Sequence, residues 1–234
     1  MRRHTAGFTL VETAIVLVII GLLIAAVLQG QELIRSARVR SLIGEQEAIG
    51  AAVLGFQDRY RALPGDYNAA SSAIACSPAC AEGNGDGLIE DVGAVPEYIL
   101  VWTHLAAAGF LNGSFYAASG TSSPAAGNTP TNAFGGHLQV IYDANWGHST
   151  NPTPRHNIKT GNQIPVEIVA EIDRKTDDGL PTSGRFQFSP YVANGPELEW
   201  GGTDTSCTTQ DFALPDTAWN QATGHPNCGG ATLF

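Results

Sequence analysis

Hydrophobic residues are concentrated near the N-terminal end of this chain. From Phe8 to Leu28 the sequence is apolar except for Thr9, Glu12 and Thr13. At about 1.5 Å per residue, a helix over this segment is long enough to cross a hydrocarbon core of about 30 Å. Two arginines precede it, which favours a cytoplasmic N-terminus and export of the remaining chain. We therefore expect residues 8–28 to form a transmembrane helix that crosses the membrane once.

The apolar pattern continues beyond this segment at helical spacing. Apolar residues recur in steps of three and four as far as Tyr60, and Pro64 with Gly65 then favours a helix end and a turn. The pattern predicts one long helix within residues 8–63. A cleaved secretory signal is the competing interpretation, but the small residues that should follow the apolar run are poorly represented near Leu28.

Residues 64–234 have the composition of a polar globular head, rich in Gly, Pro, Asn, Thr and Ser. Apolar periodicity and flanking Pro and Gly residues predict two short helices, although the second also fits the alternation of a strand. In two further segments the residue pattern is that of β-strands. The predicted bounds are 96–109 and 165–175 for the helices, and 138–142 and 185–188 for the strands.

The remaining parts of the head are expected to be irregular. Residues 66–95 and 117–132 should form loops, and the chain from Pro196 onward should be irregular. In the first helix we expect Trp102 to be buried and His104 to lie at the rim. The predicted fold class is α+β, in which a long N-terminal helix, half of it transmembrane, packs on a small antiparallel sheet with loop insertions.

All four cysteines lie in the head, in two pairs that are local in sequence. An even number of cysteines in an exported segment indicates disulfides formed in an oxidising compartment. We favour pairings that close the shorter loops, although four cysteines allow three connectivities. The predicted bonds are Cys76–Cys80 and Cys207–Cys228.

Charge and motif content argue against several functional classes. The formal charge is −10 and the head is acidic, so we expect no nucleic-acid partner. None of the six histidines has a metal-binding spacing, and the sequence contains no phosphate-binding or dinucleotide-binding loop. We therefore predict no catalytic residue and no enzymatic activity.

One loop has oxygen donors at alternate positions around a glycine, as in the first nine positions of a calcium-binding EF-hand loop. The bidentate carboxylate that should follow three residues later is replaced by Gly93. A solvated turn is the alternative interpretation. Calcium is the one cofactor that the sequence suggests, and its candidate ligands are Glu82, Asn84, Asp86, Leu88 and Glu90.

Glu12 requires a separate explanation, because an ionised carboxylate in an apolar span is costly unless a cation neutralises it. If the chain is cut after Gly7, the new α-amino group of Phe8 on a neighbouring copy could pair with Glu12. Alternatively, the carboxylate reaches the membrane surface, since Glu12 lies near the end of the span. Position in the sequence does not choose between the two.

The sequence Gly7-Phe8-Thr9-Leu10-Val11-Glu12, after a short basic leader and before an apolar run, resembles the signal of type IV prepilins and type II secretion pseudopilins. The resemblance implies that a prepilin peptidase removes residues 1–7 by cutting between Gly7 and Phe8, and that Phe8 is then N-methylated. It also implies a role for Glu12 in subunit registration.

This resemblance implies a structural subunit of a type IV pilus (a fimbrium) or a type II secretion pseudopilus. Its partners would be copies of itself or other pilin-like subunits, an inner-membrane assembly platform and membrane lipid. The head would be periplasmic before assembly into a periplasmic or extracellular filament.

Further stretches also resemble pilin-like proteins. They are Leu63 to Asp66 at the helix exit and, more weakly, 102–111 and 172–181. The helix-kinking proline of many major pilins is missing near Gln29, which leaves major and minor subunits open. A membrane-anchored periplasmic binding module with a pilin-like leader is the alternative function.

Overall fold

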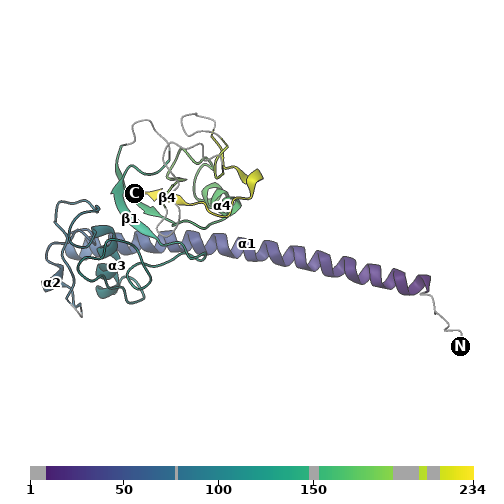
Figure 1. Cartoon of the computed structure of the whole chain (residues 1–234), viewed down its shortest axis with the longest axis horizontal. Coiled ribbons are helices and arrows are strands. Elements are labelled where there is room, and N and C mark those ends of the chain that lie inside the picture. The colour runs from purple at the N-terminus through teal and green to yellow at the C-terminus, as the bar shows by residue number, and fades with distance from the viewer. Residues whose placement is uncertain (1–8, 77–78, 148–152, 192–205, 210–216) are drawn as a thin grey trace. The chain divides into compact units, whose positions relative to one another are not determined.

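The computed structural model describes residues 9–76, 79–147, 153–191, 206–209 and 217–234. One long helix is followed by short helices and strands (Figure 1). The elements are α1 (Leu10–Tyr60), α2 (Ala70–Ala73), α3 (Glu97–Ala107), β1 (Gln139–Asp143), β2 (Arg155–Lys159), α4 (Val166–Thr176), β3 (Phe186–Phe188), the 3₁₀ turn η1 (Gln221–Thr223) and β4 (Gly230–Leu233).

The chain divides into two compact units, residues 1–38 and residues 39–234. In the first unit, α1 is apolar from Ala14 to Leu28, and its large hydrophobic side chains from Leu10 to Ile34 are exposed. Among the helices that the structure describes, α1 is the one that is long and apolar enough to cross a membrane. This agrees with the segment that the hydropathy pattern predicts.

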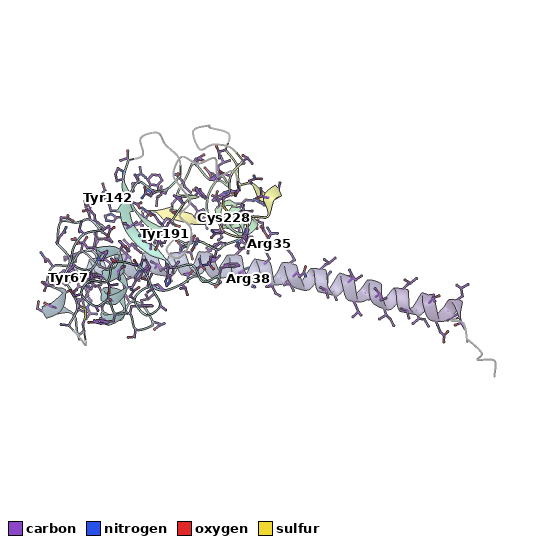
Figure 2. All side chains as sticks on the ribbon, in the orientation of Figure 1. Arg35, Arg38, Tyr67, Tyr142, Tyr191 and Cys228 are labelled. Carbon is purple, nitrogen blue, oxygen red and sulfur yellow. A yellow bond between two sulfur atoms is a disulfide. The ribbon has the colours of Figure 1, made fainter. Side chains whose placement is uncertain are left out.

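In the second unit, α1 continues to Tyr60 and buries one stripe of its surface. The buried positions recur in steps of three and four, with Ala52 and Val53 side by side, which places them on one face of the helix. The stripe ends at Phe56, whose ring centroid lies 4.5 Å from that of Tyr60 and 6.1 Å from that of Tyr67, labelled in Figure 2. The stripe consists of Val39, Leu42, Gln46, Ile49, Ala52, Val53 and Phe56.

Four antiparallel strands form one sheet in the order β1-β2-β4-β3. The last strand in the sequence, β4, therefore lies between β2 and β3. The register places Val140, Ile158, Thr232 and Phe186 in one row across the sheet. The Thr232 hydroxyl donates to Gln46 Oε1 over 3.3 Å, so this row faces α1.

Two clusters of buried side chains lie along α1. One contains Ile49 to Phe56 of α1 together with α3 and strands β1 and β2. The other contains Val39 and Leu42 with α4, β3 and the buried cysteines 207 and 228. The long helix thus contributes to both parts of the head core.

His104 is fully buried, so its predicted place at the rim is wrong. Its Nδ1 accepts the backbone N–H of Gly65 over 2.9 Å, and its Nε2 lies 2.8 Å from the carbonyl oxygen of Ala81. Burial lowers the pKa of His104, so the neutral imidazole forms both bonds, with the proton on Nε2. His104 therefore holds the turn after α1, where Gly65 has a φ of +90°.

The α+β fold and most predicted elements are confirmed. The long helix, both short helices, both strands and both disulfides are present. Two strands were missed, β2 and β4, and the prediction of an irregular C-terminal region is wrong at Gly230–Leu233. The predicted loop 66–95 also contains the short helix α2. Tertiary pairing explains the missed strands, because their partners lie far away in sequence.

Candidate functional site

The start of α1 is stabilised by two side chains of the predicted signal. The carboxylate of Glu12 accepts the backbone N–H of Thr9 over 2.8 Å and its hydroxyl over 2.9 Å. The backbone N–H of Glu12 in turn donates to the Thr9 hydroxyl over 3.3 Å. This reciprocal pattern is a capping box, which satisfies N–H groups that a helix start leaves without partners. Glu12 therefore has a local structural role that its position in the span did not suggest, although Thr-x-x-Glu is a readable signature.

The other two residues of the signal, Gly7 and Phe8, lie outside the described residues. Cleavage between them and methylation of Phe8 stay predictions. Glu12 itself is exposed within residues 1–38.

The loop predicted to bind calcium is organised around two buried carboxylates that belong to other elements. Asp66 accepts the backbone N–H groups of Gly85, Asp86 and Gly87 over 2.6, 3.0 and 2.9 Å. Glu97, at the start of α3, accepts the backbone N–H groups of Asn84 and Glu90 over 2.9 and 3.1 Å. The loop thus points backbone N–H groups at these two acids, neither of which is among the five predicted calcium ligands.

Burying the carboxylates of Asp66 and Glu97 is unfavourable for their charged forms. Burial raises the pKa of Asp66 and of Glu97, while the N–H groups that they accept act in the opposite direction. Both side chains are nearly inaccessible to water. Five backbone hydrogen bonds therefore offset the burial of two carboxylates, and they give residues 84–90 a defined path without secondary structure.

Several of the candidate calcium ligands are engaged by protein donors. Glu82 Oε1 accepts the hydroxyl of Ser71, and Asp86 Oδ2 accepts Asn84 Nδ2 over 2.8 Å. Asn84 Oδ1 and Asp86 Oδ1 accept backbone N–H groups two residues ahead, as in Asx turns. A calcium ion would have to replace these contacts, and calcium binding stays a proposal.

A second acidic group lies after α4. Asp173, Asp177 and Asp178 have carboxylate oxygens within 4.8 Å of one another. Each of them accepts hydrogen bonds from the protein. Asp173 is fully buried and accepts Trp219 Nε1 over 2.6 Å and Gly179 N–H over 3.2 Å. Asp177 and Asp178 accept hydrogen bonds from residues 180–186, so they hold the turn that follows α4.

A buried ion pair lies on the sheet, and the sequence did not predict it. Lys159 on β2 pairs with Asp143 on β1, and Asn157 Nδ2 donates to the same carboxylate over 2.9 Å. Burial lowers the pKa of Lys159, whereas Asp143 raises it. Lys159 reads as an ordinary surface residue in a sequence, because nothing local indicates that its strand lies inside the sheet.

The disulfide Cys207–Cys228 joins the segment before η1 to the residue two positions before β4, and both sulfurs are buried (Figure 2 labels Cys228). The disulfide Cys76–Cys80 closes a short loop after α2. No free cysteine is present among the described residues. Both bonds agree with a head that folds in an oxidising compartment.

Comparison with protein families matches residues 2–28 to the prokaryotic N-terminal methylation motif. This motif is the prepilin-type signal of type IV pilins and pseudopilins. The chain carries a prepilin-type signal. Comparison with curated proteins and with solved structures finds no match. The prepilin-type signal implies processing by a prepilin peptidase and assembly with other pilin-like subunits, and it favours a structural subunit over an enzyme.

The calcium proposal is tested by calorimetric titration of the full-length protein with Ca²⁺. An open site of this kind should bind at roughly 0.1–1 mM, as extracellular calcium modules do. Asp86→Asn should abolish the heat, whereas Asp58→Asn, an exposed carboxylate on α1, should leave it unchanged. Absence of heat at millimolar calcium in the unmodified protein would remove the proposal.

The buried carboxyl of Asp173 should make the free energy of unfolding depend on pH. Burial raises the pKa of Asp173 from its usual 3.8 to about 6. Its contribution to stability is therefore complete below about pH 4 and is lost as the pH rises through about 6. Relative to Asp173→Asn, the free energy of unfolding of the unmodified protein should fall by about 2 kcal/mol between pH 4 and pH 7.

This dependence is measured by chemical denaturation of both proteins across that range. Asp58→Asn is the control, since the Asp58 carboxylate is exposed and does not act on Asp173. The free energy of unfolding of this control should change with pH in the same way as that of the unmodified protein. A constant difference between the unmodified protein and Asp173→Asn at every pH would contradict the assignment.

Proposed function

We propose that this chain is a structural subunit of a filament of the type IV pilus or type II secretion pseudopilus kind. The observation that carries the proposal is the prepilin-type signal at residues 2–28, which runs directly into a helix of 51 residues. In this proposal, peptidase cleavage after Gly7 gives a mature chain that begins at Phe8. The inner membrane holds it by a single span, with the head in the periplasm.

The apolar surface of α1 supports assembly through this helix. The large side chains from Leu10 to Ile34 are between 46% and 85% exposed where the structure describes them. Such a surface is stable only in lipid or against other apolar surfaces. If copies of α1 pack together in a filament, the surface that leaves lipid is buried again, and the transfer costs little free energy.

Glu12 would act at two levels. Within one chain its carboxylate forms the capping box with Thr9. Between chains it would pair with the α-amino group of Phe8, which remains cationic after methylation because an alkylated amine keeps its charge. A carboxylate has two oxygens and several acceptor sites, so both interactions can exist together.

The proposal is tested first by the mass of the mature protein. Intact-mass and N-terminal analysis of the chain from sheared surface filaments should find a start at methylated Phe8. The same mature form found in membranes alone would assign the chain to a pseudopilus or to a minor subunit. A chain that still begins at Met1, or one cut near Leu28, would contradict the proposal.

Variants at the helix start separate the two roles of Glu12. Thr9→Ala removes the hydroxyl of the capping box but keeps the carboxylate and its bond to the residue 9 N–H. Glu12→Gln keeps an acceptor oxygen but removes the charge. If subunits register through charge, Glu12→Gln should lower incorporation into filaments at least about tenfold, and Thr9→Ala should assemble nearly normally.

The outcomes are measured by immunoblotting of sheared and membrane fractions, with total expression as the control. Equal losses for the two variants would assign Glu12 to helix capping alone. Normal assembly of Glu12→Gln into filaments would remove the registration mechanism.

A further inference from the structure

A groove of about 680 Å³ lies within residues 39–234, between α1, one face of the sheet and α4. This volume is in the range of small-molecule binding sites. Apolar side chains from every bounding element form its walls. They include Ile43 and Leu54 on α1, Ile158 on β2, Ile172 on α4 and Phe186 on β3.

Small residues of α1 line the groove on the side that faces the sheet, and they leave room for it. Gly50 and Ala51 both line it. A Cβ at Gly50 would lie 3.7 Å from Ile158 Cδ1, an ordinary van der Waals contact, so the position accepts a side chain without backbone strain. A large side chain at residue 50 would therefore occupy the groove.

One polar atom in the groove has no partner. Gln46 is 6% exposed, and its Oε1 accepts the hydroxyl of Thr232. Its Nε2 is buried and forms no hydrogen bond. A buried amide N–H group without a partner is costly, so the groove is complementary to a ligand that supplies an acceptor oxygen.

Two cationic side chains lie at the rim of the groove. Lys175 and Arg185 line it, against one side-chain carboxylate, that of Glu47, among the described lining residues. Lys175 already pairs with the half-buried Glu171 over 3.1 Å, so Arg185 is the main cation that the rim offers to a ligand. Arg185 is exposed and precedes Phe186, which pairs with Thr232 across the sheet. Arg185 Nε donates to the carbonyl oxygen of Leu233, the residue next to Thr232, over 3.1 Å.

We propose that this groove binds a long-chain fatty acid. The acyl chain would lie against the apolar walls, and the carboxylate would accept from Gln46 Nε2 and pair with Arg185 and Lys175. The acyl chain of this ligand matches the apolar walls of the groove. Its carboxylate supplies an acceptor for Gln46 Nε2 and a negative charge for Arg185. The apolar helix of a second copy would supply no such side chain, because residues 14–28 contain no acidic residue and no side-chain amide.

Photolabelling tests the proposal on the full-length protein in phosphatidylcholine nanodiscs. The probe is a palmitic acid analogue that carries a diazirine in its chain, and intact-mass analysis reads the labelled fraction. Gly50→Phe should lower labelling about tenfold by filling the groove. Gly44→Phe is the matched control, since it lies on the same helix with open space around its Cβ and should label normally.

The carboxylate contact has its own variant. Arg185→Gln should weaken labelling by the acid about tenfold and leave labelling by its methyl ester unchanged, because the ester has no charge. Arg174→Gln, another exposed cation of this region that pairs with Glu171, should change neither. Equal labelling of Arg185→Gln and the unmodified protein by the acid would overturn the proposal, as would adducts that map to residues 10–38.

A photocrosslinking residue at Leu54 tests the competing occupant. Leu54 lines the groove and is 60% exposed. A covalent dimer on irradiation in membranes would show that a second copy fills the groove, and it would overturn the fatty-acid proposal. A crosslink between this position and added fatty acid, without a covalent dimer, would support the fatty-acid proposal.

Discussion

The head of this protein depends on the burial of one stripe of α1. From Val39 to Phe56, a buried side chain recurs every three or four residues and contacts both core clusters. The sheet, α3 and α4 are too small to bury their apolar faces against one another alone, so the helix completes both cores. The single polar position of the stripe, Gln46, is bonded to Thr232 of the sheet.

Away from that stripe, buried polar groups hold much of the chain between the elements. Asp66 and Glu97 accept five backbone N–H groups of one loop, and His104 fixes the turn at Gly65. Asp173 holds the segment after α4 in the same way. Buried acceptors of this kind replace the hydrogen bonds that helices and strands would supply, and they are costly to leave unpaired.

The two ends of α1 serve different purposes in one continuous helix. Residues 10–34 expose apolar surface, and the prepilin-type signal gives that surface a use in membrane anchoring and assembly. Residues 39–60 are amphipathic and belong to the head. Near Gly50 the side chains of α1 are small, and the groove lies beside them within the head.

The sequence alone determined the features that depend on neighbouring residues: the apolar span, the signal around Glu12, the long helix and the first short helix. It favoured the disulfide pairing and the second short helix, which the structure then decided. The tertiary structure decided where β2 and β4 pair, which places Lys159 inside the sheet, and how Asp66 and Glu97 organise a loop that reads as a calcium motif. Periodicity reports which face of a segment is apolar, whereas strand partners and the burial of a charge depend on contacts between residues far apart in the chain.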